Sequence, residues 1–309
     1  MSEKKTTAEH GNNPGATSGV RKAIIPFAGL GTRFLPLSKV VPKVLWPAVD
    51  IPVLQYIVEE AKESGIEEII FVTSPGTKQV LDYFNEDAEL EKILKERKKT
   101  QILEEARKLN DLLKGIKVSQ VVQKKPLGDG HAILQAMKLI GPEPCAVLFA
   151  DDIVYSKTPC LLQLMRIFKT CQRPVIAMKK VAKEKTPSYG VFDVEKIASK
   201  LYKVKNIIEK PKMEEAPSDL VIVGKYIITP EVFEYLQSAK PSARGEIILA
   251  ATFQKMINEG KVIYGYEFEG EWLECGNKLA WLKSHLYLSL KHPEYGPELK
   301  KYLREIKEV

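Results

Sequence analysis

The sequence predicts an α/β protein whose central sheet is mixed but mostly parallel and carries helices on both faces. The first observation is alternation, because short apolar, β-branched runs recur along the chain and amphipathic segments of helical length separate them. The second is that the run 146–150 is apolar throughout, as in parallel strands covered on both faces. The third is that proline-rich turns separate the later runs, which favours a mixed extension of the sheet.

The elements can be justified in chain order. An Ala-Ile-Ile-Pro-Phe run before a glycine-rich turn predicts the first buried strand. Segment 77–114 is long, charged and without a tight cap, so we expect a helical insertion with a break. A helix should begin after Gly128. Pro211 should prevent strand 201–208 from continuing. The expected strands are 23–27, 68–73, 117–123, 146–150, 174–179, 201–208, 220–228 and 262–267. The expected helices are 52–64, 77–114, 130–140, 160–171, 230–237, 245–258, 278–291 and 297–305.

The length and the ends of the chain suggest one domain with a tail. Residues 1–20 contain almost no large apolar side chains, so we expect a disordered N-terminal segment. No repeat and no Pro/Gly-rich linker divides the remainder, which we take as a single domain, 21–309. The C-terminal helices, about 278–309, are our candidate for a contact between subunits of an oligomer.

Composition excludes several classes of function. The formal net charge of +7 is moderate, and basic residues alternate with acidic ones, so we expect no nucleic-acid partner. No apolar run approaches the length of a membrane span, so we expect no membrane association. The four cysteines lack C-x-x-C spacing, which argues against a zinc or redox site. Without a secretion signal, these observations predict a cytoplasmic protein.

The most informative motif is Ala28-Gly29-Leu30-Gly31-Thr32-Arg33, followed by Pro42-Lys43. Two glycines let the backbone turn tightly and present N–H groups to a ligand, a concavity that suits phosphate. Arg33 offers a fixed fork for phosphate oxygens, and Lys43 offers a point charge. No Gly-Lys-Ser/Thr ends the loop, and no third glycine completes a dinucleotide fingerprint. The motif indicates a nucleoside triphosphate site, with an ordinary glycine turn as the alternative.

An acidic pair follows the most apolar strand. Asp151 and Asp152 come directly after 146–150, at the end of a parallel strand where open α/β sheets bind ligands. Mg²⁺ prefers one or two carboxylates together with phosphate oxygens. Asp151 is therefore a candidate metal ligand and Asp152 a supporting residue, whereas a helix cap or a solvated turn is the alternative.

Three further segments carry polar groups at expected strand or helix ends. Gln123 and the turn at Gly128 precede a helix. The Gln123 amide has a donor and an acceptor for the edge of a base, and the glycine turn lets a ligand approach the backbone at the helix N-terminus. Glu209 and Lys210 follow a strand, although a surface ion pair is the ordinary interpretation. Glu274 lies before a helix, either as a second carboxylate near the metal or as an acid at the helix N-terminus. No Ser-His-Asp or Cys-His arrangement is evident, so the set suits phosphoryl or nucleotidyl transfer.

With these residues assembled, the chain resembles the bacterial UTP–glucose-1-phosphate uridylyltransferases, also called UDP-glucose pyrophosphorylases, from about residue 20 to its end. The residues that carry the resemblance are Ile25-Pro26-Phe27-Ala28-Gly29-Leu30-Gly31-Thr32-Arg33, Pro42-Lys43, Leu127-Gly128-Asp129-Gly130-His131-Ala132, Asp151-Asp152, Tyr189-Gly190-Val191, Glu209-Lys210-Pro211, Val223-Gly224-Lys225-Tyr226, Gly245-Glu246-Ile247 and Cys275-Gly276-Asn277-Lys278.

The resemblance implies a Rossmann-like nucleotidyltransferase fold and transfer of UMP from UTP to α-D-glucose 1-phosphate with Mg²⁺, in a homodimer or homotetramer. The implied catalytic residues are Arg33, Lys43 and Lys210. The implied nucleotide-binding residues are Ala28, Gly29, Gly31, Thr32, Gln123 and Gly128. The implied sugar-phosphate residues are Gly190, Glu209, Lys210, Gly224 and Glu246. The implied metal ligand is Asp151, with Glu274 as a second candidate.

Two segments depart from the pattern of the family. Glu274 stands where relatives usually carry Asp, and 247–251 reads Ile-Ile-Leu-Ala-Ala where they usually read Ile-Gln-Leu-Thr-Asp. These departures leave two alternatives open. One is a pyrophosphorylase for another nucleotide, such as dTTP, or for another sugar phosphate. The other is a UDP-sugar sensor without catalytic activity.

Overall fold

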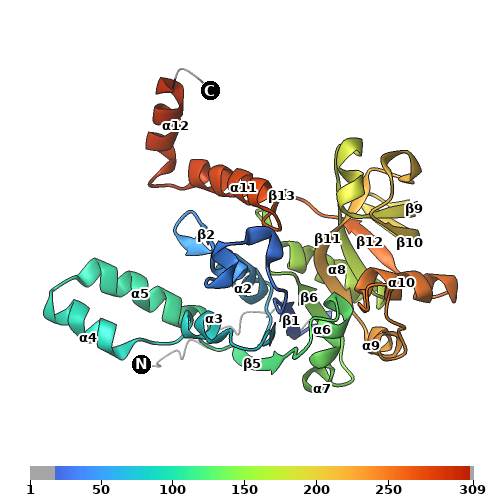
Figure 1. Cartoon of the computed structure of the whole chain (residues 1–309), viewed down its shortest axis with the longest axis horizontal. Helices are drawn as coiled ribbons and strands as arrows, with labels where there is room; N and C mark the ends of the chain where they lie inside the picture. Colours follow the sequence, from blue (N-terminus) through green and yellow to red (C-terminus); the bar gives the residue numbers. More distant parts are fainter. Residues whose placement is uncertain (1–17, 307–309) are drawn as a thin grey trace, which may run out of the picture.

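The computed structural model of the protein describes residues 18–306. Within them a nine-stranded sheet has the order β5-β4-β1-β6-β11-β8-β12-β10-β9, and β13-β7 and β2-β3 form two small sheets (Figure 1). The strands are β1 (Lys22–Pro26), β2 (Pro47–Ala48), β3 (Ile51–Pro52), β4 (Glu68–Thr73), β5 (Lys117–Val122), β6 (Cys145–Leu148), β7 (Asp152–Tyr155), β8 (Val175–Lys180), β9 (Gly190–Ala198), β10 (Leu201–Glu209), β11 (Leu220–Ile228), β12 (Tyr264–Glu267) and β13 (Glu271–Glu274).

Helices cover the sheet and extend beyond it (Figure 1). The α-helices are α2 (Val53–Glu63), α3 (Lys78–Asp82), α4 (Ala88–Glu96), α5 (Thr100–Leu112), α6 (Asp129–Gln135), α7 (Met137–Ile140), α8 (Cys160–Cys171), α9 (Pro230–Gln237), α10 (Leu249–Asn258), α11 (Lys278–Lys291) and α12 (Gly296–Glu305). Short 3-10 helices occur at η1 (Thr32–Phe34), η2 (Leu37–Lys39), η3 (Lys43–Leu45), η4 (Lys183–Ser188) and η5 (Met213–Glu215).

The sheet is mixed, as expected, but the expectation that it is mostly parallel is wrong. Strands β5, β4, β1 and β6 are parallel neighbours, as are β8 and β12. Strand β11 is antiparallel to β6 and β8, and β10 is antiparallel to β12 and β9. A tight connection through Lys200, with a left-handed φ of 60°, joins β9 to β10 as a hairpin. Apolar periodicity does not encode strand direction, which is why the sequence analysis expected too many parallel strands.

Alternate residues of the central strands pack into two cores, one on each face of the sheet. On one face, Ala23 and Ile25 of β1 pack with α2 and α8. On the other, Ile24 packs with α6, α9 and α10. Strand β6 is buried along its whole length, which is why 146–150 reads as a continuous apolar run.

Several predicted elements agree with the structure at both ends, namely strands 68–73 and 220–228 and helices 160–171, 230–237 and 278–291. The long segment 77–114 is divided into α3, α4 and α5. Figure 1 shows α4 and α5 as a hairpin that projects from the body. The N–H of Leu90 donates to Asp87 at 2.9 Å and so caps α4, while Lys98 turns the chain with a φ of 57°.

Strands β7, β9 and β13 were not expected. The apolar part of β7 is only three residues long and begins a few residues after β6, and the second half of β9 is largely exposed, so neither was recognised as a separate strand. Within residues 18–306, no helix combines the length and apolar character that crossing a bilayer requires.

The predicted disordered segment 1–20 lies mostly outside the described residues, since residues 1–17 are not described. The described part of that segment ends at Val20, which has no exposed surface and belongs to the core beside α2.

Candidate active site at the ends of the central strands

Two adjoining clefts open where the parallel strands β1, β5 and β6 end. The first has a volume of about 440 Å³ and the second about 260 Å³, and Asp129, Phe149 and Asp151 line both. Because carboxyl ends of parallel strands meet at one edge of a sheet, the loops after these strands face one another. This edge brings together residues that are far apart in the sequence.

The loop after β1 adopts the shape that its glycines permit. Gly31 has a left-handed φ of 61°, and Ser38 Oγ donates to its carbonyl oxygen at 2.8 Å. Helix η1 follows, in which Phe34 is buried and packs edge-on against Trp46 with ring centroids 4.6 Å apart. Arg33 is thereby directed into the second cleft, where its guanidinium donates to the carbonyl of Gly276 at 3.3 Å.

Lys43 and Asp151 form an ion pair at the junction of the two clefts. The distance from Lys43 Nζ to Asp151 Oδ2 is 2.5 Å, and both side chains are partly buried. Burial by itself would raise the pKa of Asp151, but the charges of Lys43 and Arg33 and the Lys43 hydrogen bond outweigh it and hold that pKa below its usual value. Asp151 therefore remains an anion beside two cations.

Asp152 is a supporting residue rather than a free ligand. Its Oδ2 accepts from the N–H of Gly224 at 3.0 Å, and its Oδ1 accepts from Trp272 Nε1 at 2.7 Å. Burial and the neighbouring Asp151 raise its pKa to about 7. A carboxyl group with both oxygens engaged in this way joins strands β7, β11 and β13.

Glu274 approaches Asp151 from β13. Tyr189 Oη donates to Glu274 Oε2 at 2.7 Å, and Asn277 Nδ2 donates to Oε1 at 3.3 Å. Burial and the Glu274 carboxylate raise the pKa of Tyr189, so its hydroxyl remains a donor. Oxygen atoms of Asp151 and Glu274 each lie 3.4 Å from the position that a Cβ would take at Gly276. The two carboxylates therefore converge on one point.

These oxygens are of the kind that binds a hard cation. Mg²⁺ takes one or two carboxylates and completes its shell with phosphate oxygens and water. The residues at Asp151 and Glu274 fit that requirement, whereas within residues 18–306 no group of three or more His, Cys, Asp or Glu residues could hold a metal.

The turn before α6 forms one wall of the first cleft. Gly128 has a φ of 98°, and a Cβ there would lie 2.4 Å from the carbonyl oxygen of Ile247. Asp129 Oδ1 accepts from the N–H groups of Gly130 at 2.6 Å and Leu249 at 3.0 Å, so it ties this turn to the start of α10. Gln123 Nε2 donates to the carbonyl of Gly128 at 3.0 Å, which holds the amide at the cleft wall.

The second cleft is lined by residues from β9, β10 and β11. Gly190, Glu209, Lys210 and Gly224 all face it. Lys210 has a left-handed φ of 48°, a strained conformation for a residue with a Cβ, and its N–H donates to the carbonyl of Tyr189 at 3.0 Å. Its ammonium lies 3.5 Å from Glu209. Strain of this kind concentrates at functional sites.

The geometry can now be compared with known proteins. The model of the family described as nucleotidyl transferase matches residues 22–289. A UTP–glucose-1-phosphate uridylyltransferase of Staphylococcus haemolyticus is 42% identical over 93% of this chain and 98% of its own. That of Bacillus subtilis is 43% identical over 91% and 94%. The chain belongs to the UTP–glucose-1-phosphate uridylyltransferases of the nucleotidyl transferase family.

Solved structures agree with this assignment. A UDP-glucose pyrophosphorylase complexed with UDP-glucose has a TM-score of 0.79 and 35% identity, and the match covers 88% of this chain and 100% of that chain. A UTP-bound UGPase from Acinetobacter baumannii has a TM-score of 0.85 and 33% identity over 93% and 100%. The α/β nucleotidyltransferase fold predicted from the sequence is confirmed.

Most site residues predicted for this uridylyltransferase lie together, with three differences. Ala28, Gly29, Thr32, Lys43, Gln123, Gly128 and Asp151 line the first cleft, and Arg33, Asp151, Gly190, Glu209, Lys210, Gly224 and Glu274 line the second. Glu246, predicted beside the sugar, lines the first cleft instead. Arg33, predicted at the triphosphate, lines the second cleft and not the first, so it would reach the phosphates from the sugar side of the junction. Gly31 lines a neighbouring cleft of about 260 Å³ and not the first cleft, so it shapes the loop without facing the first cleft.

The sequence analysis gave no role to several residues that line the site. Phe149, Tyr226 and Trp272 line the second cleft from three different strand regions. Asp129 and Tyr189 stood inside quoted motifs, but their bonding to Leu249 and Glu274 spans too many residues to be visible in the sequence.

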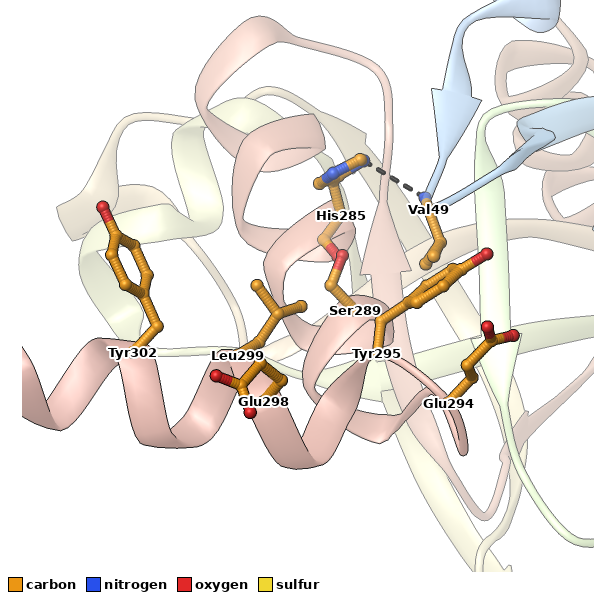
Figure 2. Close-up of a pocket in the computed structure, with 8 residues that line it drawn as sticks. All are labelled: Val49, His285, Ser289, Glu294, Tyr295, Glu298, Leu299 and Tyr302. Carbon is orange, nitrogen blue, oxygen red and sulfur yellow. Dashed lines mark hydrogen bonds between the residues drawn. The ribbon is translucent and has the colours of Figure 1, made fainter.

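A larger cavity of about 790 Å³ lies elsewhere in this uridylyltransferase. Figure 2 shows it beside α12, lined by Val49, His285, Ser289, Glu294, Tyr295, Glu298, Leu299 and Tyr302. The N–H of Val49 donates to His285 Nδ1 at 3.2 Å. Neither lysine nor arginine is among its described lining residues, so it lacks the cations that phosphate chemistry needs.

Proposed function

We propose that this protein transfers UMP from UTP to α-D-glucose 1-phosphate, giving UDP-glucose and pyrophosphate. The observation that carries the proposal is the meeting of two clefts at Asp151, one lined by the glycine loop and the other by Glu209 and Lys210. The names of the curated relatives describe this activity, and related structures contain UTP or UDP-glucose. Two substrates in adjoining clefts would bring their phosphates together at the junction.

The chemistry that we propose is in-line displacement. An oxygen of the sugar phosphate forms a bond to the α-phosphorus of UTP as the bond to the leaving pyrophosphate breaks. We assign Arg33 and Lys43 to the triphosphate and the leaving pyrophosphate, and Lys210 to the sugar phosphate. The attacking oxygen is already anionic near neutral pH, so no general base is required, and positioning and charge neutralisation do the catalysis.

The remaining assignments follow the two clefts. The nucleotide would lie against Ala28, Gly29, Thr32, Gln123 and Gly128, with Gly31 shaping the loop. The glucose moiety would lie against Gly190, Glu209 and Gly224, and Glu246 would face the nucleotide side of the junction. Glycines at these points leave space, since a Cβ at Gly190 would come within 2.8 Å of Ile222.

Mg²⁺ is the cofactor that we propose. Asp151 would bind it, and Glu274, whose carboxylate lies beside the same point at Gly276, would contribute a second oxygen. When bound, the cation would neutralise phosphate charge as a hard Lewis acid. The longer side chain of glutamate does not prevent this, because Tyr189 and Asn277 hold the Glu274 carboxylate beside Asp151.

One assay tests the proposed function against its alternatives. Purified protein is mixed with Mg²⁺, each of several nucleoside triphosphates and each of several sugar 1-phosphates, and pyrophosphate release is followed. We expect the fastest release from UTP with glucose 1-phosphate. Preference for dTTP or another sugar phosphate would indicate a different pyrophosphorylase. Binding of UDP-glucose without pyrophosphate release from any pair would indicate a sensor.

We also propose a cytoplasmic homodimer or homotetramer in which the C-terminal helices make contact. Leu279, Leu282 and Leu286 lie on one stripe of α11 and are 62%, 53% and 46% exposed, which is costly in water. The four cysteines are free, as a reducing compartment would keep them. Light scattering of the intact protein and of Leu282→Glu tests the assembly, since a contact through α11 predicts a smaller particle for the variant.

A further inference from the structure

Lys225 is a fully buried lysine that the proposed chemistry does not use. Its side chain has no exposed surface, and its Nζ lies 2.7 Å from Oε2 of Glu60 on α2. Glu60 is itself only 8% exposed, and its Oε1 accepts from the N–H of Leu161 at 2.9 Å, in the first turn of α8. The ion pair therefore joins β11 to two helices through the core that contains Val223 and Ile227.

Stability alone gives little reason for such a pair. Removing two charges from water is costly, and apolar replacements of similar volume are often as stable or more stable. Lys225 Nζ also makes no hydrogen bond of good geometry with residues 18–306, so the usual compensation for burial is incomplete. The best-attested use of buried ion pairs is to select one register or one position of the chain.

The pair lies where the regular pairing of β11 with β8 is interrupted. Pairing with β8 runs from Leu220 to Ile222 and resumes at Tyr226, with a register shift between them. Three residues of β11, 223–225, therefore face only Ala177 of β8. On the other side, pairing with β6 begins only at Lys225, so on the β8 side other interactions must determine where the segment lies.

Gly224 lies at the centre of this segment and in the wall of the second cleft. Its N–H donates to Asp152 at 3.0 Å, and its carbonyl accepts from the N–H of Phe149 at 2.7 Å. A Cβ at this position would lie 2.3 Å from Asp152 Oδ2 and 2.6 Å from Phe149. The contact is so close that a small displacement of β11 would alter the cleft.

We propose that the Lys225–Glu60 ion pair positions Gly224 against Asp152 and thereby sets the shape of the sugar-phosphate cleft. Lys225 is adjacent to Gly224 in the chain, and its side chain is tied through Glu60 to α2 and the start of α8. Lys225 and Glu60 are thus positioning residues that touch no substrate. The inference rests on the proposed function, because it assigns the second cleft to glucose 1-phosphate.

The experiment compares Lys225→Met, Glu60→Gln and the double variant Lys225→Met/Glu60→Gln. In the double variant, the Glu60→Gln change is designed to keep an acceptor for the N–H of Leu161 while both charges are removed. The matched control is Lys261→Met/Glu231→Gln, which removes a partly exposed ion pair that lines neither cleft. Each protein is measured for Tm, for KM of UTP and of glucose 1-phosphate, and for UDP-glucose binding by calorimetry.

The expected pattern separates positioning from stability. Lys225→Met leaves the buried Glu60 carboxylate without its opposite charge, so the Tm of this variant should fall by about 10 °C. The double variant should regain most of that Tm, yet keep a KM for glucose 1-phosphate raised about tenfold and UDP-glucose binding weakened equally, equivalent to ~1.4 kcal/mol. Its KM for UTP should stay within about twofold, and the control should match the wild type.

Two results would overturn the inference. A double variant that regains both Tm and a normal KM for glucose 1-phosphate would show that the pair has no positioning role. A double variant as unstable as Lys225→Met would show that the pair serves folding itself. Failure of the proposed function is distinct, because the wild type would then release no pyrophosphate, and calorimetry on the same variants would still test the positioning of the cleft.

Discussion

Gly224→Ala is the substitution for which the structure gives the most definite magnitude. The added methyl group would lie 2.3 Å from Asp152 Oδ2 and 2.6 Å from Phe149 Cδ2, whereas ordinary contact begins at 3.4 Å. One partner must therefore move by about 1 Å, and overpacking of this kind costs about 1–3 kcal/mol. A shift of the strand also changes the geometry of the hydrogen bond that the N–H of Gly224 donates to Asp152.

The expected consequences are a modest loss of stability and a large loss of activity. A cost of about 2 kcal/mol corresponds to a fall in Tm of about 5 °C for a chain of this size. A displacement of about 1 Å in a reacting geometry lowers kcat/KM on the order of 100-fold. Most of the loss should appear with glucose 1-phosphate as the varied substrate, because Gly224 lines the second cleft and not the first.

The assay is pyrophosphate release with either substrate varied, together with thermal unfolding. Gly265→Ala is the contrasting variant, because its Cβ would lie 2.0 Å from the Met178 side chain at a position that lines neither cleft. We expect that variant to lose stability but to retain considerably more activity. If Gly224→Ala instead matches Gly265→Ala in KM for glucose 1-phosphate, the close packing at Gly224 does not shape the cleft and the reasoning fails.

Three further predictions concern other parts of the molecule. Lys43→Ala should lower kcat by about 10²–10³-fold, as for other preorganised charge-stabilising groups, and near-normal turnover at saturating substrates would contradict its role. Gly128 has a φ of 98°, and a Cβ there would lie 2.4 Å from the carbonyl oxygen of Ile247, so Gly128→Ala should weaken UTP binding in calorimetry. Its circular dichroism spectrum should stay close to that of the wild type, and unchanged UTP affinity would contradict the role of this turn. Glu68→Gln should lower urea stability at pH 7, and the gap from wild type should close as pH falls through the lowered pKa of Glu68; a gap independent of pH would refute this.

The sign of the last prediction follows from the surroundings of Glu68. Burial would raise its pKa, but hydrogen bonds from Lys117 and Ser119 and the Lys117 charge outweigh it, so the pKa is lowered on folding. A carboxyl group of this kind stabilises the fold above its unfolded pKa. That stabilisation disappears once the group is protonated, when it resembles the glutamine variant.

Local sequence was enough to predict many elements and the set of candidate residues. Strand 68–73 and helix 160–171 agree with the structure because adjacent side chains alone determine their apolar periods. The glycine loop after β1 was also visible, since its conformation at Gly31 depends on nearby residues. Strand β7 was missed because its apolar run, Ile153 to Tyr155, is only three residues long and its partner strand β13 is over a hundred residues away.

The sequence by itself determined the class of fold, the family and the charged groups available for chemistry, because motif order and apolar periodicity are written in neighbouring residues. Only the tertiary structure decided which of those groups meet. It alone shows that Lys43 pairs with Asp151, Tyr189 with Glu274, and Lys225 with Glu60. It also shows that β11 runs antiparallel to β6. The physical reason is that such contacts arise from the packing of whole strands and helices, which no local pattern specifies.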